Sequence, residues 1–97
     1  NPRINGTAYG TSKAALHMFS QCLANDVREH NIAVNILDPG GMKSEGSSIM
    51  PWAQHDWDSR VEPEEVGLSA VYLALRDAQS MTGGLVRRAE FGQTWGV

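Results

Sequence analysis

Two side chains near the start of the chain have types and a spacing that suit proton transfer. Tyr9 and Lys13 stand four residues apart in Tyr-Gly-Thr-Ser-Lys, which puts a phenol and an ammonium side by side on one face of a helix. A tyrosine in water titrates near pH ~10, but a nearby cation favours the phenolate and makes the phenol usable as a general acid or base. Taken alone, the pair is better explained as a surface contact that supports a helix, so the surrounding elements must decide.

A second chemically suggestive feature is the turn that contains Pro39, Gly40 and Gly41. Proline cannot donate to a sheet ladder, and consecutive glycines let the backbone turn and approach a ligand closely. From Met42 to Val61 no periodicity is visible, and large apolar side chains stand alone among polar ones. Loops of this kind often serve as lids or binding loops. Three large apolar residues stand in this loop, Met50, Trp52 and Trp57, and its tryptophans fit a lid and the core equally well.

The elements expected to position these residues alternate between helix and strand. Thr7 could cap a helix over residues 8–29, which carries two apolar faces and therefore has two packing partners to find. The first face is formed by Leu16, Phe19, Leu23 and Val27, and the second by Ala14, Met18 and Cys22. Asn31 suits the left-handed position that ends such a helix.

The rest of the chain predicts a short parallel unit. The apolar, β-branched residues 32–37 read as a buried strand. A second helix covers residues 62–77, with Pro63 and acidic side chains in its first turn, and a final strand covers residues 85–89 after a glycine turn. Two strands joined through a helix need neighbours and cover on both faces. The fold class is therefore α/β, as part of a larger doubly wound sheet.

Composition and charge argue against several classes of binding partner. A net charge of −3 with scattered basic residues argues against nucleic acid or an anionic membrane surface, and no apolar run reaches the ~18 residues of a membrane span. The histidines lack the spacing of metal ligands, so no metal site is expected. The single cysteine, Cys22, reads as a packing residue, and with no targeting segment in view it favours the cytoplasm.

The order of these features resembles the classical short-chain dehydrogenases/reductases. The match begins with Tyr9-x-x-Ser12-Lys13-Ala14-Ala15-Leu16 and continues through residues 32–35, the turn at Pro39-Gly40 and the small turn at residues 81–83. It covers nearly the whole chain. The resemblance implies that residues 1–97 are the C-terminal part of a single Rossmann-type domain, a doubly wound parallel sheet, in an oxidoreductase that interconverts an alcohol and a carbonyl with NAD or NADP.

The resemblance also assigns roles to individual positions. Tyr9 matches the general acid/base, and Lys13 matches the residue that activates it and binds the nicotinamide ribose. Met42 lies where a backbone amide meets the carboxamide, and Ser44 stands where the family usually has threonine. The implied cofactor-binding residues are Tyr9, Lys13, Pro39, Gly40, Gly41, Met42 and Ser44, and the implied substrate loop contains Met50, Trp52 and Trp57.

Several parts of the family pattern lie outside these 97 residues. The glycine-rich pyrophosphate turn, the carbonyl-polarising serine and the asparagine of the proton relay are all expected upstream of Asn1. We therefore expect the 97 residues alone to be inactive, and the parent to be a homodimer or homotetramer. The alternative is a non-catalytic, truncated product that acts by association with partner chains. The stretch from Arg87 to Trp95 is more charged than the usual family ending, which leaves the packing of the tail open.

Overall fold

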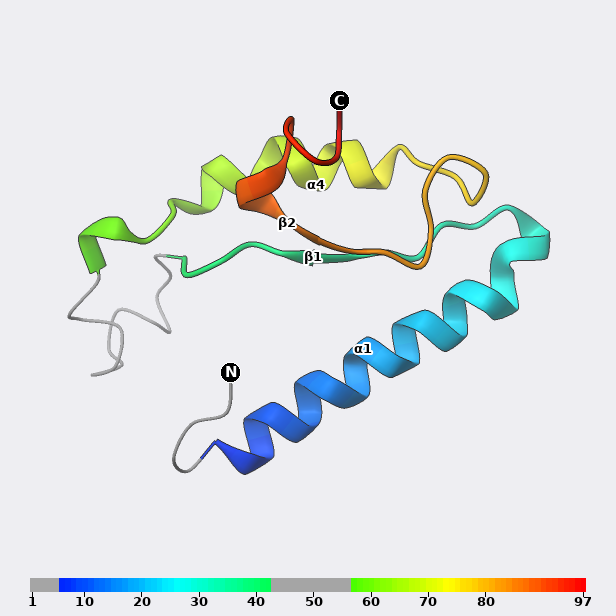
Figure 1. Ribbon diagram of the computed structural model, residues 1–97, viewed down its shortest axis with the longest axis horizontal. Helices are drawn as coiled ribbons and strands as arrows, with labels where there is room; N and C mark the ends of the chain where they lie inside the picture. Colours follow the sequence, from blue (N-terminus) through cyan, green and yellow to red (C-terminus); the bar gives the residue numbers. More distant parts are fainter. Residues whose placement is uncertain (1–5, 43–56) are drawn as a thin grey trace. The chain divides into compact units, whose positions relative to one another are not determined.

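The computed structural model describes residues 6–42 and 57–97 of the chain (Figure 1). These residues belong to two compact units. The first contains Asn1–Ile36 and Arg76–Gly84, and the second contains Leu37–Leu75 and Leu85–Val97.

A long helix, α1 (Thr7–Val27), dominates the first unit. Its first hydrogen bond runs from the Gly10 N–H to the Gly6 carbonyl at 2.8 Å. The prediction that Thr7 caps the helix is therefore wrong: Gly6 is the cap residue, and its carbonyl starts the ladder one residue earlier. The α-helix also ends before residue 29, because the chain tightens into the 3-10 turn η1 (Arg28–His30).

Asn31 closes this helical segment. It adopts φ 58° and ψ 37°, the left-handed conformation that the sequence predicts, and its N–H bonds to the Arg28 carbonyl. Because an asparagine tolerates this conformation better than most residues, it is a natural stop.

The apolar faces of α1 remain largely uncovered within the chain. Leu16, Met18 and Phe19 are 48%, 60% and 61% exposed, and Ala24 is the only buried residue of the helix. Ala24 lies against Gly83 of the same unit, with an ordinary contact distance of 3.9 Å to a Cβ placed there. Within the described part of its own unit, α1 therefore does not bury both of its apolar faces.

Side chains pair the segment after α1 with the loop at residues 76–84. The Asn35 side chain donates to the Met81 carbonyl at 3.0 Å and accepts from the Gly84 N–H at 3.1 Å. The Val34 N–H bonds to the Thr82 hydroxyl at 3.0 Å. Residues 32–35 therefore lie outside the regular ladder, and the strand predicted over residues 32–37 shortens to β1 (Ile36–Asp38).

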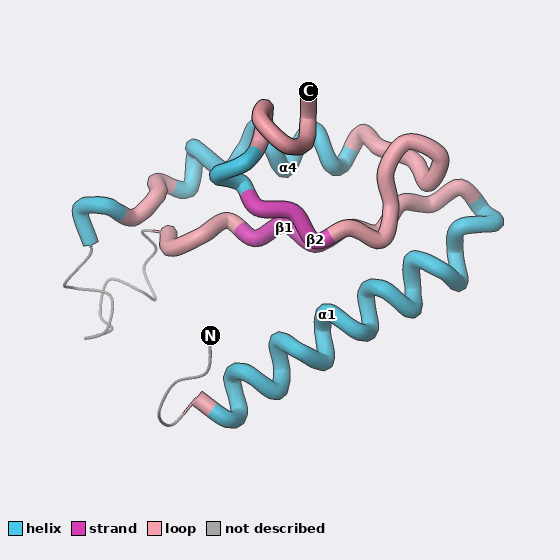
Figure 2. The backbone as a smooth tube through the Cα atoms, in the orientation of Figure 1, coloured by secondary structure: helices cyan, strands magenta, loops and turns pink. Residues whose placement is uncertain are grey.

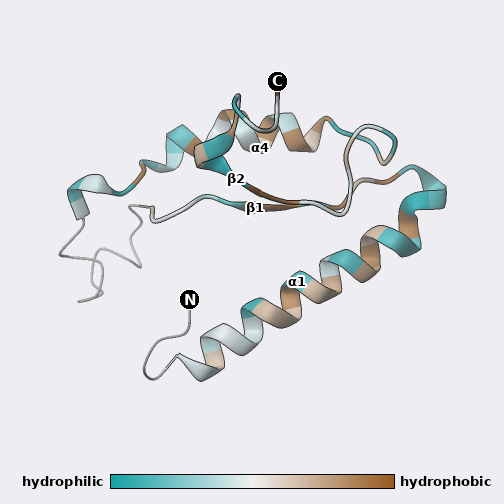
Figure 3. Cartoon of the chain, viewed as in Figure 1, coloured by the Kyte–Doolittle hydropathy of each residue, from teal (hydrophilic) through white to brown (hydrophobic). Residues whose placement is uncertain are grey.

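β1 pairs with β2 (Leu85–Arg87) in a two-stranded parallel sheet (Figure 2). Both strands carry apolar residues (Figure 3). The prediction of a buried strand over residues 32–37 is not met, because no residue of β1 is buried, and Leu85 in β2 is 54% exposed. The chain turns into the 3-10 helix η4 (Arg88–Glu90) directly after Arg87, so the strand predicted to reach residue 89 ends earlier.

The second unit contains the other helical segments, which are η2 (Trp57–Ser59), η3 (Pro63–Val66) and α4 (Gly67–Ala74). Glu62 and Glu65 form a reciprocal capping box at the start of η3, which satisfies backbone donors that a helix start leaves open. The predicted helix over residues 62–77 is thus two helices that end at Ala74. Leu75, the next residue, has φ −92° and ψ 1° and so leaves the helical conformation.

The tail of the chain packs through aromatic rings. The Trp95 ring centroid lies 4.8 Å from that of Phe91 and 6.1 Å from that of Tyr72 in α4. The Trp95 indole N–H donates to the Arg87 carbonyl at 2.7 Å, and the residue is only 8% exposed. The packing of the tail, open at the level of sequence, is therefore an aromatic cluster of Tyr72, Phe91 and Trp95 that contributes to the core of this unit.

Candidate functional site

Tyr9 and Lys13 lie together on the first turns of α1. The Lys13 ammonium nitrogen is 5.5 Å from the centroid of the Tyr9 ring, a range in which a cation and an aromatic face attract each other. Tyr9 is 58% exposed, and the Ser12 hydroxyl donates to its carbonyl at 2.8 Å. Helical spacing alone produces this arrangement, and it presents a phenol and a cation on one surface of the first unit.

The predicted turn at residues 39–42 belongs to the second unit and follows β1. The Asp38 carboxylate accepts the Gly40 N–H at 3.0 Å across Pro39, a local turn that aspartate commonly stabilises. Gly40 has φ 78°, so its glycine is required by conformation. Among the described residues, no atom lies within 4 Å of a Cβ placed at Gly40.

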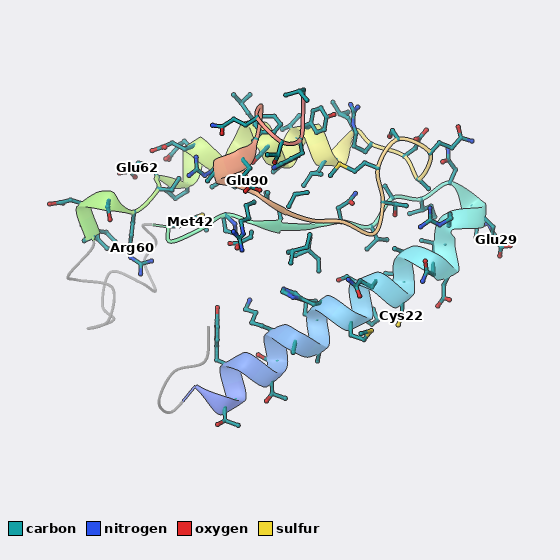
Figure 4. The ribbon with its side chains drawn as sticks, in the orientation of Figure 1. Cys22, Glu29, Met42, Arg60, Glu62 and Glu90 are labelled. Carbon is teal, nitrogen blue, oxygen red and sulfur yellow. The ribbon has the colours of Figure 1, made fainter. Side chains whose placement is uncertain are left out.

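The far side of the turn is bound to residues 60 and 61. The Val61 N–H donates to the Gly41 carbonyl at 2.8 Å, and Met42 and Val61 form a parallel β-bridge. Arg60 donates from Nη1 to the Met42 carbonyl at 3.5 Å; Figure 4 labels both residues, Met42 beyond β1 and Arg60 beyond η2. Sequence reasoning did not single out Arg60, because nothing in a lone arginine at the end of an aperiodic loop indicates which backbone it meets.

The remaining predicted loop residues divide between described and undescribed positions. Ser44, Met50 and Trp52 lie outside the described residues. Trp57 opens η2 and is half-buried, and its carbonyl accepts the Arg60 N–H at 3.1 Å. Trp57 therefore stands one turn before the residue that contacts Met42.

The chemistry of the turn fits the nicotinamide end of a dinucleotide. Glycine at position 40 lets a flat ring approach the backbone closely, and the peptide group that begins at the Gly41 carbonyl, bound by the Val61 N–H, offers polar atoms at a defined position. Tyr9 and Lys13 offer a proton donor and a cation with ammonium donors, which suit a substrate oxygen and ribose hydroxyls. The residues present are therefore compatible with an NAD(P) cofactor.

The part of the chain that the structure describes holds no cluster of side chains suited to metal binding. Residues 6–42 and 57–97 contain no group of three or more His, Cys, Asp or Glu side chains able to hold a metal ion. Cys22, expected to pack, is exposed instead. No described helix combines the length and apolarity needed to cross a membrane.

Comparison with known proteins identifies the family. The family model for short chain dehydrogenases matches residues 1–52, which include Tyr9, Lys13 and the whole turn at residues 39–42. The chain belongs to the short-chain dehydrogenase family, whose members are oxidoreductases of Rossmann-type α/β fold.

Individual relatives extend the similarity over most of the chain. It is 32% identical to oxidoreductase asL5 of Sarocladium schorii over 88 residues, covering 82% of this chain and 35% of the relative. It is 34% identical to L-xylulose reductase of Caenorhabditis elegans over 93 residues, covering 86% and 36%. With galactitol 2-dehydrogenase of Rhizobium johnstonii the identity is 33% over 89 residues, covering 82% and 35%. The chain thus spans about a third of the length of these relatives.

Proposed function

We propose that this chain is the C-terminal part of an NAD(P)-dependent oxidoreductase that interconverts an alcohol and a carbonyl. Tyr9 is the general acid/base, and Lys13 assists it and binds the cofactor ribose. The observation that carries the proposal is the Tyr9–Lys13 pair, with the ammonium nitrogen 5.5 Å from the phenol ring, in a chain of the short-chain dehydrogenase family.

The proposed chemistry assigns proton transfer to the protein. A bound nicotinamide supplies or accepts the hydride. During carbonyl reduction the Tyr9 hydroxyl donates a proton to the substrate oxygen, and during alcohol oxidation the Tyr9 oxygen accepts it. The positive charge of Lys13 stabilises the phenolate left after donation, because an opposite charge nearby favours the ionised form. Tyr9 is 58% exposed, which supports access of a substrate to its side chain.

The turn at residues 39–42 supplies the cofactor contacts in this proposal. Pro39, Gly40, Gly41 and the backbone of Met42 would border the nicotinamide, with Ser44 contributing a hydroxyl. The glycine at position 40 and the fixed carbonyl of Gly41 support this assignment. Met50, Trp52 and Trp57 would contact the substrate. The sequence leaves NAD and NADP as equal candidates, and the substrate is a small alcohol or carbonyl compound.

We further propose that residues 1–97 complete a doubly wound sheet together with residues beyond them. A two-stranded parallel sheet exposes edges that such folds normally pair, and the relatives are about three times longer than the aligned part. The catalytic apparatus therefore needs more than these 97 residues, which by themselves should be inactive. A cytoplasmic location remains part of the proposal.

Association with other chains is a second candidate role. Leu16 and Phe19, which share the first apolar face of α1, are 48% and 61% exposed, and an exposed apolar face commonly marks an interface. In an enzyme this face would join subunits of a homodimer or homotetramer. In a non-catalytic product, binding of partner chains through this face would be the whole function.

Replacing Tyr9 by Phe in the intact protein tests the catalytic proposal. Turnover of a panel of secondary alcohols and polyols with NAD+ or NADP+ should fall about 10²–10⁴-fold, because one positioned acid/base contributes roughly that factor. Cofactor affinity, measured by NAD(P)H fluorescence titration, should remain. Lys13→Met should lower both turnover and cofactor affinity.

The matched control is Tyr72→Phe, which removes the same hydroxyl from the only other tyrosine of the chain. This variant should retain turnover. If Tyr9→Phe is as active as Tyr72→Phe, the assignment of the acid/base is wrong, and loss of self-association on Phe19→Glu would then favour the association role.

A further inference from the structure

The peptide between Gly41 and Met42 is held on both sides by the segment that follows η2. The Gly41 carbonyl accepts the Val61 N–H at 2.8 Å. A trans peptide is planar, with its N–H directed opposite to its carbonyl, and no cis bond occurs among the described residues. The bond from Val61 therefore also sets the direction of the Met42 N–H, which points away from Val61.

Arg60 contacts the next carbonyl along the chain. Its Nη1 lies 3.5 Å from the Met42 carbonyl oxygen, which is longer than a typical charge-assisted hydrogen bond. Together Val61 and Arg60 fix the carbonyls on both sides of the Met42 N–H. The orientation of this amide is therefore decided by residues that follow it by about twenty positions.

The same side chain explains why position 41 is glycine. A Cβ at Gly41 would lie 3.0 Å from Nη1 and 3.3 Å from Cζ of Arg60, so the guanidinium occupies the space a side chain would take. Gly41 is not among the positive-φ glycines, whereas Gly40 is. The two glycines thus serve different purposes: Gly40 provides the turn, and Gly41 provides room for Arg60.

We infer that Arg60 is a positioning residue for the cofactor: it orients the Met42 backbone toward the nicotinamide end of the dinucleotide without touching the reacting atoms. This inference rests on the proposed function, since it requires that the turn at residues 39–42 binds nicotinamide.

The test compares two ligands in the intact protein carrying Arg60→Met, which keeps the length of the side chain and removes its charge and donors. NAD(P)H reaches the turn, whereas ADP-ribose lacks the nicotinamide. We expect the Kd for NAD(P)H to rise roughly three- to tenfold, as for loss of one ordinary hydrogen bond, with the Kd for ADP-ribose unchanged. The Kd of Arg60→Lys for NAD(P)H should lie between those of the wild type and Arg60→Met. The control is Arg28→Met, a charge removal at the exposed end of α1, which should bind both ligands as the wild type does.

Each result decides the question. An equal loss of affinity for NAD(P)H and ADP-ribose would assign Arg60 a general structural role and overturn the inference. Wild-type affinity for NAD(P)H in Arg60→Met would overturn it while leaving the proposed function intact. If the unmodified protein binds neither NADH nor NADPH, the proposed function fails and the inference falls with it.

A double-mutant cycle gives an independent check. Gly41→Ala should displace the flexible guanidinium from Met42 and raise the Kd for NAD(P)H by a similar factor. In the Arg60→Met background the same substitution should add little, because the group it displaces is gone. Equal penalties in both backgrounds would show that position 41 acts independently of Arg60, contrary to the inference.

Discussion

Substitution of Gly96 by alanine is a demanding test of the aromatic cluster at the tail. Gly96 has φ 70°, and a Cβ there would overlap the edge of the Phe91 ring, with Cε1 and Cδ1 as the nearest atoms. An L-residue in the left-handed region costs about 1–2 kcal/mol. Forcing a methyl group into a packed site adds about 1–3 kcal/mol. We therefore expect Gly96→Ala to destabilise the protein by about 2–5 kcal/mol.

Gly92→Ala is the matched control, because it carries only the first of these costs. Gly92 has φ 83°, close to that of Gly96, and a Cβ there would meet no atom within 4 Å. Its expected destabilisation is therefore about 1–2 kcal/mol. The difference between the two variants isolates the contact with Phe91, and the backbone strain cancels.

The assay is urea unfolding of the intact protein followed by tryptophan fluorescence, which reports the environment of Trp95 together with those of Trp52 and Trp57. Gly96→Ala should have the lower free energy of unfolding of the two variants. Adding Phe91→Leu, a smaller side chain, should recover part of the loss in Gly96→Ala and none in Gly92→Ala. If the two alanine variants are equally stable, the packing of the Phe91 ring against residue 96 is refuted.

Two further predictions concern the loop at residues 76–84. Hydrogen bonds from the Ser80 backbone, the Ser80 hydroxyl and the Asn31 amide hold the pKa of Asp77 below its ordinary value of 3.8. A group whose pKa is lowered by folding stabilises the fold above its unfolded pKa, and this effect is lost as the pH falls through the folded pKa. The advantage of wild type over Asp77→Asn in urea unfolding should therefore be full at pH 7, begin to fall near pH 3.8 and vanish only below the lower pKa of the folded protein. An advantage that persists unchanged at pH 2 would contradict this. Asn35→Ala removes two partly buried bonds and should cost about 2–3 kcal/mol, measured by the same unfolding assay. The side-chain hydrogen bonds of Asn31 are exposed and longer, so Asn31→Gly should lower the free energy of unfolding by less than Asn35→Ala does. Equal losses in the two variants would contradict this order.

The sequence by itself determined the features that depend on near neighbours along the chain. The four-residue spacing of Tyr9 and Lys13 brings them together on α1, as predicted. Asn31 takes the left-handed conformation, and Gly40 forms the expected turn. These outcomes follow from helical geometry and from the backbone preferences of single residues, so neighbouring residues suffice to predict them.

Only the tertiary structure decided the features that join distant segments. Asn35 replaces part of a strand ladder with side-chain bonds to Met81 and Gly84, so the strand is shorter than its apolar pattern predicts. Arg60 contacts the Met42 carbonyl. Trp95 donates a hydrogen bond to the Arg87 carbonyl and packs against the Tyr72 ring. Such pairings depend on which segments fold against each other, and the residue types alone do not predict these partners.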